Sequence, residues 1–171
     1  MTKVFIDGSA GTTGLRIYER LSQRKDLELL ILPDELRKNN DARRQMLSLA
    51  DIAFLCLPDK AAIEAVSLIE NDHVAVIDTS TAHRTNDDWA YGFAELSEKH
   101  RNAIRNSKRI ANPGCHASGF IASVYPLVNH GIIPADFPLT AYSLTGYSGG
   151  GKSLIAEYED ENRDPRHESH R

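Results

Sequence analysis

The chain has 171 residues, of which 41% are hydrophobic and 26% charged, with a formal net charge of −4. This composition is ordinary for a globular protein, and the length allows one full domain and a fragment of a second. The acidic balance argues against an extended basic face for nucleic acid or anionic lipid, and no apolar run approaches the roughly 18 residues of a membrane span.

We therefore expect a cytoplasmic protein without nucleic-acid or membrane partners, because the N-terminus also lacks a basic start followed by an apolar targeting core. The two cysteines, Cys56 and Cys115, lie in unrelated contexts, and neither belongs to a C-x-x-C pair. This pattern excludes a disulfide framework and a zinc knuckle, so no metal site is expected and single-thiol chemistry stays open.

A glycine-rich loop follows the first predicted strand. The apolar run over residues 3–7 ends at the segment GSAGTTG, residues 8–14, and a helical pattern covers residues 15–24. The glycines and hydroxyl side chains of the loop are Gly8, Gly11, Gly14, Ser9, Thr12 and Thr13. Such a loop can bind a pyrophosphate through the free N–H groups that open the helix, although a turn that only closes a strand against a helix has a similar pattern.

The next strand, over residues 26–33, ends in a charged segment where a dinucleotide fold meets the adenosine ribose. An acid there selects a free 2′-hydroxyl, whereas a nearby arginine accommodates a 2′-phosphate. Asp34 and Glu35 compete here with Arg37 and Lys38, and we favour the phosphorylated cofactor.

Strands and helices then alternate. We predict helices over residues 42–50 and 60–70, and strands over residues 50–58 and 73–80, with Cys56 as a core residue. Alternation of this kind predicts a doubly wound parallel sheet of the α/β class. Residues 79–96 have no sustained period and form a long loop, and a helix follows from about Ser97 to Asn106.

The segment ANPGCHASG, residues 111–119, places Cys115 after a Pro-Gly turn and at the start of a predicted helix over residues 115–128. A helix N-terminus lowers the pKa of a thiol and supplies N–H groups for an oxyanion hole, so Cys115 is a candidate nucleophile. A small buried residue at a helix start is an equally weighted interpretation. His116 points about 100° away from its neighbour and is a poor candidate base. The remaining histidines are expected in loops or on the surface: His73, His83, His100, His130, His167 and His170.

Residues 139–153 begin as an alternating strand and end in glycines, before a possible helix over residues 153–160. Four of them match the phosphate loop G-x-x-x-x-G-K-S of nucleotide hydrolases: Gly146, Gly151, Lys152 and Ser153. A phosphate loop normally follows the first strand of its sheet and needs a later magnesium-binding acid. Only a permuted order, with Asp78 as that acid, would satisfy this requirement, so a nucleotide hydrolase is disfavoured.

The segments FIDGSAGTTGLRI, CLPDKAA, IDTSTAHR, ANPGCHASG and TGYSGGGKS together closely resemble the shorter N-acetyl-gamma-glutamyl-phosphate reductases, a family of the semialdehyde dehydrogenase superfamily. The resemblance covers residues 3–155. It implies a Rossmann-type NADP-binding domain over residues 1–113 and the start of an α+β catalytic and dimerisation domain over residues 114–171. It also places the second glycine segment beside the nicotinamide end of the cofactor, in place of a phosphate loop.

The resemblance further implies a reaction. Cys115 would attack the acyl phosphate of N-acetyl-glutamyl phosphate and expel phosphate, and hydride from NADPH would reduce the thioester to N-acetyl-glutamate semialdehyde. The implied substrate-binding residues are Arg84, Asn112 and Gly114. The implied cofactor-binding residues are Gly8, Ser9, Ala10, Gly11, Thr12, Thr13, Gly14, Leu57, Pro58, Ser80, Ser148 and Gly149.

The chain also departs from this family. Family members continue well beyond this length, and their general base, a histidine of the second half, has no counterpart among residues 1–171. We therefore expect a truncated chain or fragment that binds NADP(H) poorly and turns over little substrate. The alternatives are an enzyme similar to aspartate-semialdehyde dehydrogenase and an inactive remnant that only binds nucleotide. A homo-oligomer is expected, because an exposed partial sheet has to be covered.

Overall fold

The computed structural model of the protein describes residues 1–161, without the side chains of Tyr147, Ser148, Lys152 and Ser153. The strands are β1 (Thr2–Asp7), β2 (Leu27–Leu30), β3 (Ile52–Leu55), β4 (Ala75–Asp78), β5 (Ala90–Tyr91) and β6 (Arg109–Ala111). The α-helices are α1 (Thr12–Leu21), α2 (Asn40–Leu49), α3 (Asp59–Ser67), α4 (Glu98–Asn106), α5 (Cys115–Asn129) and α6 (Gly151–Glu159). Short 3-10 turns are η1 (Asp34–Leu36) and η2 (Tyr147–Gly150).

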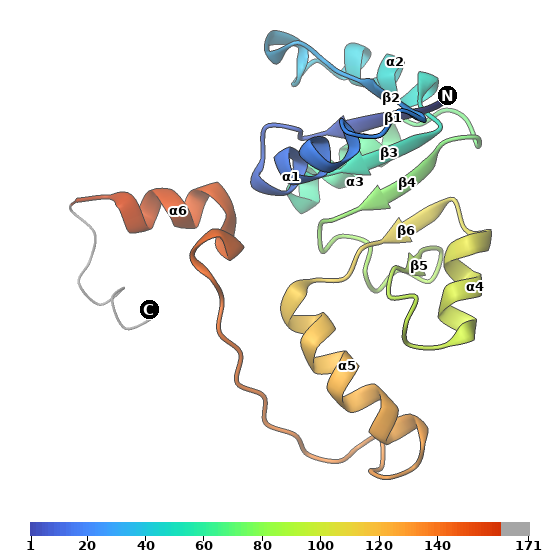
Figure 1. Ribbon diagram of the computed structural model, residues 1–171, viewed down its shortest axis with the longest axis vertical. Helices are drawn as coiled ribbons and strands as arrows, with labels where there is room; N and C mark the ends of the chain where they lie inside the picture. Colours follow the sequence, from blue (N-terminus) through green and yellow to red (C-terminus); the bar gives the residue numbers. More distant parts are fainter. Residues whose placement is uncertain (162–171) are drawn as a thin grey trace. The chain divides into compact units, whose positions relative to one another are not determined.

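The strands form one parallel sheet in the order β2-β1-β3-β4-β6-β5 (Figure 1). The chain leaves β1 toward β2 on one side and returns to β3 on the other side, so the order switches between β1 and β3. Ligands of open α/β sheets bind beyond the carboxyl ends of the strands at such a switch point. The Rossmann-type α/β fold predicted from the alternation of elements is confirmed.

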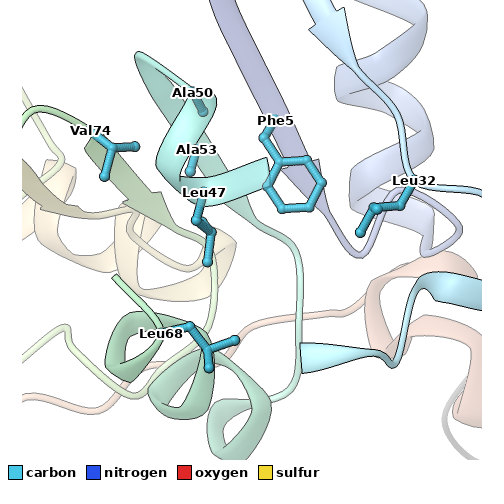
Figure 2. Close-up of a cluster of buried hydrophobic side chains, with 7 residues drawn as sticks. All are labelled: Phe5, Leu32, Leu47, Ala50, Ala53, Leu68 and Val74. Carbon is cyan, nitrogen blue, oxygen red and sulfur yellow. The ribbon is translucent and has the colours of Figure 1, made fainter. Parts of the chain in front are cut away.

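One face of the sheet carries most of the core. The larger cluster of buried side chains consists of Phe5, Leu32, Leu47, Ala50, Ala53, Leu68 and Val74 (Figure 2). Leu55, Ala62, Ala65 and Val76 continue it beneath α3. Full burial of side chains such as Phe5 and Leu47 contributes about 1.5–3 kcal/mol each to folding. Ile6 points to the opposite face, since side chains alternate along a strand, and there it lines a cavity with Leu15 and Tyr18 of α1.

The starts of the helices differ in how they are capped. The Asn39 side chain accepts a hydrogen bond from the Ala42 N–H at the start of α2, at 2.9 Å. Ser97 does the same for the His100 N–H in α4, at 3.3 Å. No side chain caps α1 or α5 in this way, and both are preceded by glycine. The N–H groups that open α1 and α5 are thus left to other partners, which is the arrangement that anion sites use.

Several predicted boundaries are corrected. Helix α1 begins at Thr12 instead of Leu15, so Gly14 lies within its first turn. Strand β2 ends at Leu30 instead of Pro33, because η1 begins directly after that proline. The predicted loop over residues 79–96 contains β5, which pairs with a strand that had not been predicted, β6.

The alternating segment at the start of residues 139–153 is not a strand. Residues 137–146 have no regular structure, and no strand of the described residues pairs with them. Tyr142 and Leu144 are 87% and 75% exposed. Alternation alone predicts a strand here, but a strand needs a neighbouring strand as its hydrogen-bond partner. The described residues provide none for this segment.

The chain divides into a compact unit over Met1–Thr140 and a second unit that starts at Ala141. The first unit contains the sheet and α5, and the described part of the second contains η2 and α6. The domain boundary between residues 113 and 114 that the resemblance implies stays a prediction. Among residues 1–161, no helix has both the length and the apolar character required to cross a bilayer.

Candidate active site

The loops that follow β1, β3, β4 and β6 are joined to one another along the carboxyl edge of the sheet. Three backbone hydrogen bonds make the connections: Cys56 N–H to the Asp7 carbonyl (2.8 Å), Thr79 N–H to the Leu55 carbonyl (3.0 Å) and Asn112 N–H to the Asp78 carbonyl (2.7 Å). The structure thereby brings together the predicted loops of the first unit: the glycine loop, the Leu57-Pro58 segment, the DTSTAHR loop and the NPGC turn.

The glycine loop is held tightly against the loop after β3. Gly8 has a φ of +88°, and a Cβ on it would lie 2.2 Å from the Cys56 carbonyl oxygen. A Cβ on Gly14 would lie 2.3 Å from the Gly8 carbonyl oxygen. The lack of space for a Cβ, together with the positive φ of Gly8, explains why Gly8 and Gly14 are glycines. The loop then opens the uncapped helix α1, as a pyrophosphate site requires.

A cavity of about 160 Å³ lies beside this loop, at the end of β2. Its lining includes Ser9, Ile31 and Arg37, whereas neither Asp34 nor Glu35 contributes to it. Arg37 pairs with Asp34, with 2.6 Å between Nη2 and Oδ1, and its buried Nε has no hydrogen-bond partner. The cavity therefore has a cationic side chain in its wall, at the position where the ribose of a dinucleotide would lie.

Cys115 is the first residue of α5, directly after the N-cap residue Gly114, and it is exposed. The first turn is closed by the Ser118 N–H, which donates to the Gly114 carbonyl at 2.8 Å. The thiol thus has access to solvent at a helix N-terminus. The alternative interpretation of Cys115 as a buried residue is wrong.

The other cysteine lies in a different environment. Cys56 is half-buried at the carboxyl end of β3, and burial raises the pKa of its thiol to about 11. Desolvation disfavours the thiolate more than the hydrogen bond with Thr79 favours it. Cys56 is therefore a poor nucleophile, although it lies at the edge of the core and not within it.

The predicted substrate residues Arg84, Asn112 and Gly114 lie next to one another. Arg84 donates from Nε to the Asn112 carbonyl and from Nη2 to the Thr79 carbonyl, both at 3.0 Å. A Cβ on Gly114 would lie 2.7 Å from Arg84 Nη1. The guanidinium thus lies between the loop after β4 and the turn that leads to Cys115.

A buried cluster around Asp78 organises the loop that carries Arg84. The Asp78 carboxylate accepts hydrogen bonds from the Ser80 N–H at 2.9 Å, the Ser80 hydroxyl at 2.7 Å and His83 Nδ1 at 2.6 Å. The His83 ring stacks on Trp89 with 4.1 Å between ring centroids. Ser80, a predicted cofactor residue, therefore directs its hydroxyl into the loop.

The sequence interpretation of two members of this cluster needs correction. His83 lies in a loop, as expected, but the loop buries it, and it is only 8% exposed. Asp78 had no role beyond the disfavoured phosphate-loop hypothesis, although an acid at the end of an apolar strand is a signal for a buried partner. Trp89, which stacks on His83, lies in a segment without hydrophobic periodicity. The local sequence therefore does not predict that these two rings are in contact.

The remaining predicted cofactor residues divide between the units. Leu57 and Pro58 lie between β3 and α3, and Thr12 and Thr13 open α1. Ser148 and Gly149 lie in η2, within the unit that starts at Ala141. The strand that a phosphate loop requires before Gly146 is missing from the described residues, which further disfavours a nucleotide hydrolase. His167 and His170 lie outside the described residues.

Comparison with known proteins shows similarity to semialdehyde dehydrogenases. Residues 33–106 match a family described as "Semialdehyde dehydrogenase, NAD binding domain". The N-acetyl-gamma-glutamyl-phosphate reductase of Chelativorans sp. is 56% identical over 162 residues, which are 95% of this chain and 52% of that protein. The enzyme of the same name from Brucella ovis is 53% identical over 94% of this chain and 52% of that protein. The chain spans about half the length of the curated relatives it matches.

Solved structures support the fold. Aspartate semialdehyde dehydrogenase from Francisella tularensis superposes with a TM-score of 0.64 at 19% identity, over 99% of this chain and 54% of that one. Aspartate semialdehyde dehydrogenase II from Vibrio cholerae superposes with a TM-score of 0.59 at 20% identity, over 92% of this chain and 50% of that one. At such low identity the likeness concerns the fold alone.

Proposed function

Because the chain is homologous to N-acetyl-gamma-glutamyl-phosphate reductases over about half of their length, we propose that it supplies the cofactor site and the nucleophilic thiol of such a reductase. The proposed reaction reduces N-acetyl-gamma-glutamyl phosphate to N-acetyl-glutamate 5-semialdehyde with release of phosphate. The observation that carries the proposal is the exposed Cys115 at the N-terminus of α5, beside the other loops of the sheet edge.

The first step follows from this position. The Cys115 thiolate attacks the carbonyl carbon of the acyl phosphate, the C–O bond to phosphate breaks, and a thioester forms on Sγ. N–H groups at the start of α5 are placed to stabilise the negative charge that develops on the carbonyl oxygen. Asn112, Gly114 and the Nη1 edge of Arg84 border the turn where the departing phosphate would lie.

The residues present fit NADP(H). Gly8, Ala10 and Gly11 lie in the loop between β1 and α1, where the backbone can approach a pyrophosphate without a side chain in between. Arg37 lines the cavity at the end of β2 and would supply the positive charge for a 2′-phosphate. When bound, the cofactor supplies the hydride that reduces the thioester to the semialdehyde. The proposal includes a cytoplasmic homo-oligomer as the working form.

Intact mass spectrometry tests the proposal. The 171-residue chain is incubated with N-acetyl-glutamyl phosphate in the absence of cofactor, and the expected result is one acyl adduct per chain with release of one phosphate. Cys115→Ala is expected to abolish the adduct, and the matched Cys56→Ala is expected to retain it, because the Cys56 thiol stays protonated at neutral pH.

Two outcomes would contradict the proposal. One is an adduct that survives in Cys115→Ala, and the other is the absence of any adduct in a chain that shows a cooperative unfolding transition. Aspartyl phosphate in a parallel incubation separates the two substrate classes, since the proposed substrate should acylate the chain faster.

A further inference from the structure

The Arg84 guanidinium joins two loops that are far apart in the sequence. Nε donates to the backbone carbonyl of Asn112, and Nη2 donates to that of Thr79, each at 3.0 Å. Thr79 follows β4 and Asn112 follows β6, so one side chain connects the ends of two adjacent strands. Arginine can make this bridge because its donors are fixed in one plane and point to different sides.

Gly114 completes the contact. Its φ of −77° is accessible to any residue, so its backbone conformation does not demand glycine. Space does, because a Cβ on Gly114 would lie 2.7 Å from Nη1 and 3.3 Å from Cζ of Arg84. The guanidinium therefore packs directly against the residue that precedes Cys115, and a side chain at that residue would displace it.

The loop that carries Arg84 is itself held from two sides. Asp78 binds Ser80 and His83 from within, as described above. Asp59, at the start of α3, accepts hydrogen bonds from the backbone N–H and the hydroxyl of Thr81. Arg84 therefore extends from a backbone that is fixed before any substrate arrives.

We propose that Arg84 is a positioning residue, which fixes the start of α5 and with it the Cys115 thiol, and that Gly114 is the second part of the same device. The inference rests on the proposed function insofar as Cys115 is the nucleophile. In this arrangement Nε and Nη2 of Arg84 donate to backbone carbonyls. Nη1, beside Gly114, then borders the turn where a substrate phosphate would lie.

Alkylation of Cys115 tests this inference without any substrate or cofactor. The second-order rate with iodoacetamide is measured on the full chain across a pH series, with the modified residue identified by peptide mass. Arg84→Ala, Arg84→Lys and Gly114→Ala are compared with the parent. Lysine keeps the charge but cannot bridge both carbonyls, and Gly114→Ala keeps the arginine but displaces it.

All three variants are expected to alkylate about threefold or more slowly at neutral pH and to displace the pH profile, because a loosened helix start no longer holds the Cys115 sulfur in one position at the N–H groups that open α5. Arg16→Ala is the matched control, since Arg16 is 82% exposed on α1 and pairs only weakly with Glu19 at 3.6 Å, and it should keep the parent profile. Cys56 reports on the fold in the same samples, because its half-buried thiol, with a pKa of about 11, should react faster when the sheet opens.

Parent-like profiles in Arg84→Lys and Gly114→Ala would overturn the inference. These two variants decide the question if Arg84→Ala opens the sheet. An arginine that only binds substrate phosphate would leave alkylation unchanged and weaken acylation alone. If the parent chain forms no acyl adduct but the variants still alkylate slowly, the proposed function fails while the positioning role stands.

Discussion

Cys56 and Cys115 show how position determines the chemistry of one residue type. Cys56 follows β3, where its carbonyl oxygen occupies the space that a Cβ on Gly8 would need and its thiol is desolvated. Cys115 begins α5 and is exposed. Burial without a compensating cation raises the pKa of the Cys56 thiol. The chain thus keeps one thiol inert within the cofactor-side loops and presents the other to solvent.

Alkaline pH should destabilise the parent chain more than Cys56→Ala. In the fold this thiol keeps its proton up to a pKa of about 11, whereas its ordinary value is 9.0. The stability that it contributes is therefore complete below the ordinary value and is lost as pH rises to the folded one, a total of about 2–3 kcal/mol. Urea unfolding at several pH values across this range measures it. The lysines and tyrosines are the same in both proteins, so their contribution cancels in the comparison. A free energy of unfolding with the same pH dependence in both proteins would contradict the prediction.

At the scale of elements, an almost completely buried ion pair connects α2 to β1. Nε and Nη2 of Arg43 lie 3.0 and 2.9 Å from Asp7 Oδ2, with both side chains at most 5% exposed. Nη1 reaches Glu64 of α3 at 3.3 Å. Burial raises the pKa of Asp7, and Arg43 opposes this effect. Since Asp7 directly precedes Gly8, the pair also fixes the backbone from which the glycine loop departs.

Removal of the cation should destabilise the fold strongly. Arg43→Met leaves Asp7 buried without a partner and is expected to cost about 3–5 kcal/mol at neutral pH. The loss should shrink in mild acid, because a protonated Asp7 no longer needs the guanidinium. Arg44→Met is the matched control: Arg44 is 41% exposed and pairs with exposed Asp41 and Glu70, so it should cost less than about 1 kcal/mol. Denaturant unfolding measures both, and equal losses would refute the role of burial.

At the scale of the whole molecule, the parallel sheet brings four loops to one edge, where a dinucleotide and a thiol can meet. The strand order reverses between β1 and β3, and the loops after these strands are in direct contact. The cavity with Ser9 and Arg37 lies toward the β2 side of this point, and Cys115 lies toward β6. This separation along the edge suits an extended cofactor between the two positions.

Cofactor binding should stabilise the whole sheet, because a ligand that binds only the folded state raises its unfolding temperature. We expect a larger thermal shift with NADPH than with NADH. Arg37→Ala should reduce the NADPH shift and leave the NADH shift, since a hydrogen bond to a charged group contributes about 1.5–3 kcal/mol. Arg16→Ala, also on the surface, should change neither shift. An equal loss for both cofactors in Arg37→Ala would mean that this residue does not recognise the 2′-phosphate.

The alternation of β1 to β4 with α1 to α3, the glycine loop and the helix that begins at Cys115 could all be predicted from the sequence. These features depend on hydrophobic periodicity and on local backbone preferences, which act over a few residues. The boundaries were less accurate where neighbours decide them. Helix α1 starts before Gly14, and the two-residue β5 exists only because it pairs with β6.

Only the tertiary structure decided which side chains work together. Periodicity gives no sign that Arg84 binds the carbonyls of Thr79 and Asn112, or that His83 is buried against Asp78 and Trp89. The alternating start of residues 139–153 is a second example. Its pattern predicts a strand, but the described residues provide no neighbouring strand for it. The sequence by itself determined most of the elements and singled out Cys115 as the candidate nucleophile. The contacts between elements depend on residues distant in the chain, which local patterns do not encode.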